Sequence, residues 1–137
     1  MNALRTLQAR EKEWWMRLLT KRGPHRGRMV PSYPPRLPLP FKPRPRLEGG
    51  YVYVVYRRAI FAYGRISEVR RHPGTRVGTR QQAVRPGYEL CVDGPMKRFP
   101  CKLACRGFRN LRYSPLLLHR LSPAVAHQTI AKLRLTP

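Results

Sequence analysis

Apolar and aromatic residues concentrate in two neighbouring stretches in the middle of the chain. Residues 51–56 (YVYVVY) and 59–69 (AIFAYGRISEV) are rich in β-branched and aromatic side chains, and only the basic pair Arg57-Arg58 separates them. This composition predicts two strands with a short connection. Gly64, inside the second stretch, predicts a bulge or a sharp bend.

Two further strands are predicted downstream, over residues 88–93 and 96–105. Asp93-Gly94 lies between them and is a strong signal for a hairpin turn. Pro95 and Pro100 make this an edge or irregular hairpin, because proline cannot donate to a strand ladder.

The end of the chain predicts two helices, over residues 116–121 and 124–133. Each follows a Ser-Pro pair, Ser114-Pro115 and Ser122-Pro123. Serine at the N-cap followed by proline at the first helical position is typical of a helix start.

The first 22 residues predict a basic amphipathic helix. From residue 3 onward, leucine and tryptophan recur near one face at helical spacing; Asn2 can cap the start, and Gly23-Pro24 ends the pattern. Such a helix can dock on a partner or a membrane surface, or it can pack on its own domain.

The next stretch, residues 24–48, predicts an extended strap. It holds eight prolines interspersed with arginine and lysine. Proline excludes helix interiors and favours extended backbone, so the strap is either a solvated linker or an arm along a partner. We therefore expect an α+β protein with a helix at 1–23, a strap at 24–48 and a domain at 49–137.

Charge is the strongest indication of function. The chain of 137 residues has 29 lysine and arginine residues against 6 acidic ones, a net charge of +23, and 23 of the 29 are arginine. A polyanion would screen this charge, and the arginine fork suits phosphate. A GC-rich coding bias would also raise arginine and proline content; nucleic acid is the favoured partner, RNA ahead of DNA.

One segment combines basic and aromatic residues most densely. Residues 106–113 (RGFRNLRY) have three arginines and two aromatic rings, which can contact phosphates and stack on bases. The alternative is a structural corner with a buried phenylalanine. The residues predicted to bind nucleic acid are Arg57, Arg58, Arg76, Arg80, Arg106, Phe108, Arg109, Arg112 and Tyr113.

The runs GGYVYVVYRRAIFAYGRI, VRPGYEL and RGFRNLRY resemble the small PUA-like domains, the group that includes the ASCH and EVE domains. The resemblance covers roughly residues 49–115. It implies a β-barrel that binds RNA or DNA, in some members a modified base. With it, the expected fold is a small PUA-like β-barrel with an N-terminal helix, a proline-rich strap and C-terminal helices.

Catalytic and metal-binding signals are weak. Cys91, Cys101 and Cys105 lack the paired-knuckle spacing of structural zinc sites, so we expect buried thiols and no metal or other cofactor. Glu68 and His72 form the one acid–histidine pair at close spacing, and an enzyme would need both in one pocket. No phosphate-binding loop or nucleophile motif occurs, so we expect a protein that is not an enzyme.

The sequence thus predicts a non-catalytic nucleic-acid-binding protein, with three alternatives. One is a structural component of a ribonucleoprotein, such as a divergent or organellar ribosomal protein. Another is a phage or mobile-element protein that acts on a host nucleic-acid machine by protein contact, and the third is a PUA-like enzyme. No apolar run reaches the length of a membrane span. We expect an intracellular protein, in the cytoplasm or in an organelle matrix if the N-terminus is a targeting segment.

Overall fold

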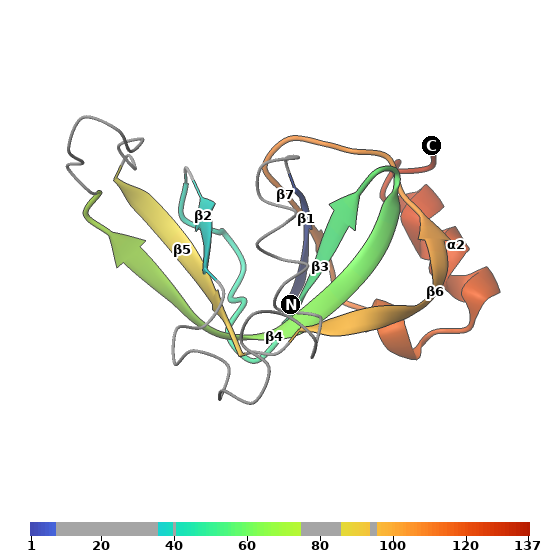
Figure 1. Ribbon diagram of the computed structural model, residues 1–137, viewed down its shortest axis with the longest axis horizontal. Helices are drawn as coiled ribbons and strands as arrows, with labels where there is room; N and C mark the ends of the chain where they lie inside the picture. The colour runs from blue at the N-terminus through green and yellow to red at the C-terminus, as the bar shows by residue number, and fades with distance from the viewer. Residues whose placement is uncertain (8–35, 40, 75–85, 94–95) are drawn as a thin grey trace, which may run out of the picture.

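The computed structural model describes residues 1–7, 36–39, 41–74, 86–93 and 96–137 (Figure 1). These residues form seven strands and one α-helix. The strands are β1 (Asn2–Thr6), β2 (Arg36–Leu39), β3 (Tyr51–Tyr56), β4 (Ala59–His72), β5 (Gly87–Val92), β6 (Lys97–Ala104) and β7 (Leu111–Ser114). A 3-10 turn, η1 (Leu118–Arg120), and the helix α2 (Pro123–Lys132) follow.

The sheet is built around β4, which is long enough to pair with strands in both halves of the molecule. The strand order is β2-β5-β4-β3-β1-β7, with β6 also paired to β4. Among the described residues, the edge strands β2 and β7 do not pair with each other, so the sheet is open. The expectation of a closed β-barrel is therefore wrong: β5 and β2 extend from one half of β4, and β3, β1 and β7 from the other (Figure 1).

The central hairpin confirms the predicted strands at 51–56 and 59–69. β3 and β4 pair in antiparallel register from Tyr56 opposite Ala59 to Tyr51 opposite Arg65. The two-residue connection, Arg57-Arg58, has φ of 49° and 62°. Positive φ at both positions matches the type I′ turn, whose twist suits the flanking strands.

The predicted hairpin between the next two strands is wrong. β5 and β6 do not pair with each other; both pair antiparallel with β4, with Val92 opposite Ile66 and Lys97 opposite Tyr63. The backbone N–H of Asp93 donates to the carbonyl of Arg65 across 2.9 Å, so the chain continues along β4 instead of turning back. The length of β4, 14 residues, allows one edge to accept both strands.

The N-terminal helix is also wrong where the structure describes it, because residues 2–6 form β1, which lies between β3 and the edge strand β7. This strand runs parallel to β3 and antiparallel to β7. Ala3 and Leu4 are both fully buried, on opposite faces of the sheet. Asn2 bonds to distant backbone, accepting from Tyr51 N–H at 2.9 Å and donating to the Ser114 and Leu116 carbonyls. Residues 8–22 of the predicted helix lie outside the described residues.

One of the two expected C-terminal helices forms. The Ser122 side chain accepts from Val125 N–H at 3.4 Å, and Pro123 opens α2 as predicted. At the first Ser-Pro pair, the Ser114 hydroxyl accepts from Leu116 N–H at 3.2 Å, which closes a local turn. Only the short turn η1 follows, so the prediction of a helix over 116–121 is wrong.

Two cores lie on the two faces of the sheet. The first core joins both halves of the sheet and includes Leu37, Leu39, Leu47, Val52 and Leu90. The second core lies under α2 and η1 and includes Leu4, Tyr53, Leu103, Leu118 and Ile130. Residues 36–39 of the strap belong to the sheet as β2, and Leu37, Leu39 and Leu47 are buried in the first core; residues 24–35 and 40 lie outside the described ranges.

Candidate nucleic-acid interface

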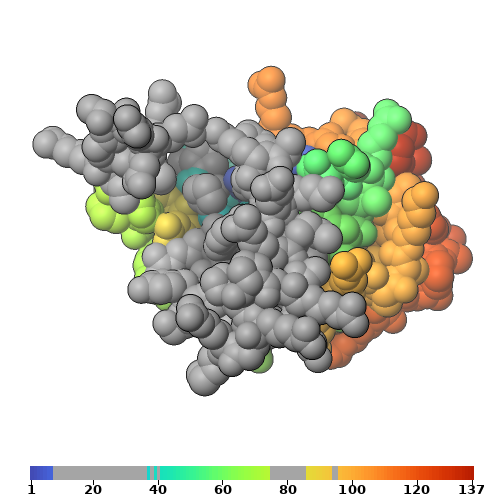
Figure 2. All heavy atoms as spheres, in the orientation of Figure 1, coloured from blue at the N-terminus to red at the C-terminus, as the bar shows by residue number. Residues whose placement is uncertain are grey.

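Six arginines lie on three separate parts of the chain that meet at one end of the sheet. We call this surface the basic end; its members are Arg57, Arg58, Arg106, Arg109, Arg112 and Arg134. In Figure 1 it lies where the β3–β4 turn, the segment after β6 and the C-terminal end of the chain meet. Figure 2 shows green, orange and red atoms from these parts at the corresponding upper right of the molecule.

Backbone contacts hold the basic end together. The N–H of Cys105 donates to the carbonyl of Arg58 at 2.9 Å, which ties the β3–β4 turn to the segment after β6. The next residue, Arg106, donates from its backbone to the carbonyl of Leu135 at 2.8 Å and from Nε to the carbonyl of Arg134 at 2.9 Å. Arg106 therefore links β6 to the end of α2.

The end of α2 supplies the sixth arginine through a left-handed cap. Arg134 has φ of 59°, its N–H donates to the Ala131 carbonyl, and Leu135 N–H donates to the Ile130 carbonyl. This is the bonding pattern of a Schellman motif, in which glycine usually takes the left-handed position. Arg57, Arg58 and Arg134 thus all have positive φ, a backbone region that is unfavourable for side chains with a Cβ.

The segment 106–113 divides between the two faces of the sheet. Phe108 packs against the second core, its N–H donates to the Thr6 hydroxyl at 3.1 Å, and the Arg112 guanidinium lies 5.3 Å from its ring centre. Tyr113 packs against the first core instead. The structure therefore keeps Phe108 with the arginines of the basic end and separates Tyr113 from them. Arg76 and Arg80 lie outside the described residues.

Tyr113 lines a groove of about 460 Å³ with residues of the strap. Phe41, Lys42 and Arg44 form the strap side, and Asn110 and Leu111 connect the groove to the basic end along the chain. Phe41 is 71% exposed, which is unusual for a large aromatic side chain. An exposed ring between cations is suited to stacking on a nucleic-acid base.

A second pocket, of about 520 Å³, was not predicted from the sequence. We call it the histidine pocket; it is lined by Tyr51, Tyr63, Gly64, Arg65, Asp93, Lys97, His119 and Arg120. Tyr51 carries a weak sequence signal, because it shares a strand face with Tyr53. Tyr63 carries none, because it comes opposite Tyr53 only through the register shift between Val54 and Val55. His119 carries no such signal, because only the tertiary fold places η1 beside β3.

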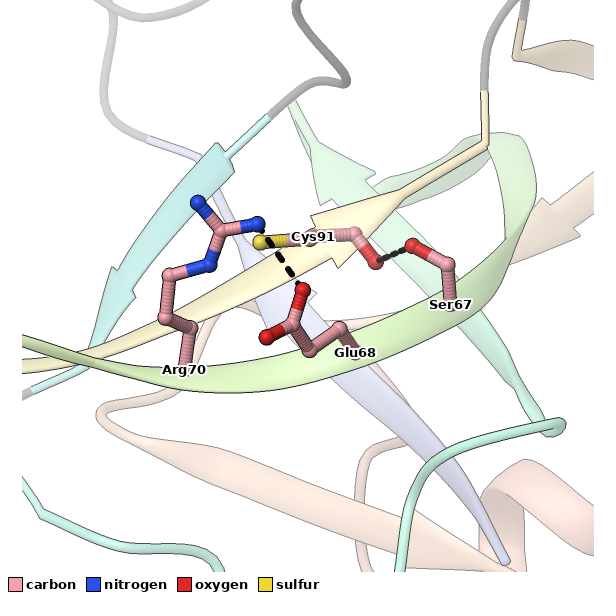
Figure 3. Close-up of polar contacts among 4 residues, drawn as sticks. All are labelled: Ser67, Glu68, Arg70 and Cys91. Carbon is pink, nitrogen blue, oxygen red and sulfur yellow. Dashed lines mark hydrogen bonds and ion pairs between the residues drawn. The ribbon is translucent and has the colours of Figure 1, made fainter.

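The alternative catalytic pair does not form. The Glu68 carboxylate accepts from the Arg70 guanidinium at 2.8 Å, and the neighbouring Ser67 hydroxyl donates to the Cys91 carbonyl at 3.0 Å (Figure 3). His72 instead faces Glu89, with 3.5 Å between Nε2 and Oε1, and its Nδ1 accepts from Gly74 N–H. The structure gives Glu68 and His72 separate charged partners.

Cys91 lies buried in β5, while Cys101 and Cys105 lie against the second core. Burial raises the pKa of the Cys105 thiol to about 11. Within the described ranges, no three histidine, cysteine or acidic residues are arranged to hold a metal ion. Nor does any described helix have the length and apolar character needed to cross a membrane.

No protein-family model, curated protein or solved structure matches this chain. The resemblance to PUA-like domains stays a prediction.

Proposed function

We propose that this protein binds nucleic acid, RNA in preference to DNA, through the basic end and the adjoining groove, without catalysing a reaction. The observation that carries the proposal is the gathering of six arginines without acidic neutralisation. Throughout the described parts of the chain, none of the six forms an ion pair with a carboxylate; the ion pairs there are Arg70–Glu68 and His72–Glu89. Uncompensated guanidinium groups at one surface attract a phosphate backbone.

The fold supports this proposal because it holds three of these arginines in an unfavourable backbone conformation. Left-handed conformation costs an L-residue roughly 1–2 kcal/mol, and three of the six arginines adopt it. Asparagine and glycine would suit the same turn better. Strain of this kind at a charged surface is a reason to test that surface for function.

The groove favours RNA with unpaired bases. Phe41 and Tyr113 offer rings, and Lys42 and Arg44 offer charge beside them. Proteins that recognise RNA commonly stack splayed bases on aromatic side chains, whereas bases within a duplex are already stacked. Phosphate contacts at the basic end and base contacts in the groove would be joined by the segment 106–113.

The test is a salt titration of binding to a single-stranded RNA with hydroxyl ends, measured by fluorescence anisotropy. Each neutralised phosphate contributes about 0.7 to the slope of log affinity against log salt for a single strand. The double variant Arg57→Gln/Arg58→Gln should lower that slope by about 1 to 1.5. Arg71→Gln is the matched control, because Arg71 is exposed near the opposite end of β4.

A parent protein whose affinity does not change with salt would contradict the proposal. Because the control removes one charge and the double variant removes two, a loss of slope in Arg71→Gln half as large as in the double variant would show that binding depends on total charge and not on the basic end. Duplex DNA and duplex RNA serve as competitors, and the groove predicts that both compete less well than the single strand.

A further inference from the structure

The histidine pocket has flat aromatic walls fixed by the second core. Tyr63 and His119 stack with 4.2 Å between ring centres and 14° between planes. Tyr51 lies tilted against His119 at 4.7 Å. Tyr53 lies fully buried behind them in the second core, and Tyr51 and Tyr63 pack against that core. The volume of about 520 Å³ is within the roughly 300–1,000 Å³ typical of small-molecule sites.

The rim of this pocket is strongly positive. Arg65, Lys97 and Arg120 line it and are exposed, whereas Asp93 is the one acidic residue among the lining side chains that the structure describes. In the described part of the chain, none of these three cations forms an ion pair. With neutral His119, three positive charges and one negative charge leave a net charge of +2.

His119 contributes a neutral, oriented ring. The Tyr53 hydroxyl and His119 Nδ1 are 2.8 Å apart and share a hydrogen bond, and burial raises the pKa of Tyr53 to about 12, so the phenol keeps its proton. When the hydroxyl is the donor, the proton of the neutral imidazole is on Nε2, where a ligand can accept it. Burial, Arg120 and Lys97 lower the pKa of His119, which keeps the ring neutral near pH 7. A neutral imidazole offers one donor to an acceptor such as a phosphoryl oxygen.

We propose that the histidine pocket binds a nucleotide that bears a phosphomonoester, with the planar base against the aromatic walls and the phosphate at the cationic rim. A phosphomonoester has a charge of about −1.5 to −2 near pH 7, which complements the net +2 of the pocket. An internal phosphodiester has only one negative charge and is linked to a sugar on each side. Two kinds of ligand carry a phosphomonoester next to a base: a free nucleotide and the phosphorylated end of a strand. In the strand-end form the inference rests on the proposed function.

The first experiment measures small ligands by isothermal titration calorimetry at pH 7.5. The probes are the four ribonucleoside 5′-monophosphates, adenosine and inorganic phosphate. Charge-assisted hydrogen bonds to the phosphate should make at least one monophosphate bind about tenfold or more tightly than adenosine. Arg120→Gln and Lys97→Gln should each remove most of this difference.

The matched control is Arg98→Gln. Arg98 is exposed and adjacent to Lys97, but neighbouring side chains of a strand point to opposite faces, and Arg98 does not line the pocket. Circular dichroism confirms that each variant is folded. Unchanged binding in Arg98→Gln and loss in both pocket variants would support the site.

The second experiment compares short RNA strands that differ only at their ends: 5′-phosphate, 3′-phosphate or hydroxyl. A preference of about tenfold for one phosphorylated end, lost in Arg120→Gln, identifies the strand end as ligand. If a free monophosphate binds but neither phosphorylated strand end is preferred, and Arg120→Gln abolishes the binding of the monophosphate, the ligand is a free nucleotide. Both results support the inference.

The inference is overturned if phosphate improves affinity in neither experiment, or if the improvement persists in both pocket variants. Its failure can be separated from failure of the proposed function. Binding of hydroxyl-ended RNA tests the proposed function alone, through its dependence on Arg57 and Arg58, whatever result the phosphorylated ligands give.

Discussion

The hydroxyl of Tyr53 and Nδ1 of His119 share a hydrogen bond across 2.8 Å, joining β3 to η1, 66 residues later in the chain. Tyr53 has no solvent exposure, so its hydroxyl needs partners inside the protein; these are His119 Nδ1 and the backbone of Leu118 and His119. The contact fixes the ring that forms one wall of the histidine pocket. It connects the packing of the second core to the candidate ligand site.

Replacing Tyr53 by phenylalanine should lower the free energy of unfolding by about 0.5–1.5 kcal/mol, the net value of a hydrogen bond. The ring and its packing remain in Tyr53→Phe, so the loss isolates the hydroxyl. Tyr51→Phe is the control, because the Tyr51 side chain is only partly buried. Urea denaturation of the three proteins measures the difference, and equal midpoints would contradict the stabilising role of this bond.

Stability should fall in mild acid partly because of His119. Its pKa is lowered in the folded protein, so below the ordinary value of about 6.5 the unfolded chain binds more protons than the folded one. The contribution is present above pH 6.5 and is lost as the pH falls through the lowered folded value. His119→Gln should therefore show a smaller loss of stability than the parent between about pH 6.5 and 5.

The control for this pH dependence is His127→Gln, because His127 is exposed on α2. Denaturant midpoints measured across the pH series provide the comparison. If His127→Gln flattens the profile as much as His119→Gln does, the pH dependence does not come from the histidine pocket.

The turn between β3 and β4 should become more stable when its arginines are replaced by residues suited to positive φ. Arg57→Asn with Arg58→Gly should raise the free energy of unfolding by about 1–2 kcal/mol, because both positions are left-handed. The same change removes two charges from the basic end and should weaken RNA binding. Arg57→Ala with Arg58→Ala removes the same charges while keeping the strained backbone.

Thermal denaturation and RNA anisotropy measure the two effects of the turn variants. Higher stability with weaker binding is expected for the Asn-Gly variant, and weaker binding without higher stability for the Ala-Ala variant. Stronger RNA binding by the Asn-Gly variant would contradict a role for these arginines in the basic end.

Gly50, directly before β3, should not tolerate a side chain. A Cβ at this position would overlap the backbone carbonyl of Met1, which cannot move without disturbing β1. Gly50→Ala should destabilise the fold by about 2–3 kcal/mol or more. Gly107→Ala is the control, because its Cβ would meet only the Thr6 methyl at 3.5 Å, an ordinary contact. Equal melting temperatures for the two variants would show that β1 does not lie against Gly50.

Local sequence rules predicted the elements whose causes are local. The paired stretches around Arg57-Arg58 became β3 and β4, because β-branched and aromatic residues favour strands and two residues suffice for a hairpin. Ser122-Pro123 became the start of α2 through a cap bond three residues away. The arginines near residues 57 and 106 were identified from composition, although not their proximity to one another.

The tertiary structure decided the elements whose partners are distant. Leu4 and Leu7 have helical spacing, yet Leu4 belongs to the second core and Leu7 to the first, because β1 inserts between β3 and β7. Propensity over five residues is weak compared with two ladders of backbone hydrogen bonds and burial on both faces. The hairpin predicted at Asp93-Gly94 likewise did not form, because β5 and β6 both pair with the same edge of β4.

The candidate sites follow the same division. The sequence by itself determined that this chain carries an extreme positive charge, rich in arginine, with aromatic rings near residues 106–113. Only the tertiary structure placed Arg134 beside Arg106, separated Tyr113 from Phe108, and brought His119 against Tyr53 and Tyr63. The physical reason is that charge and propensity belong to individual residues, whereas a site is made by contacts between segments, and those depend on how the whole chain buries its two cores.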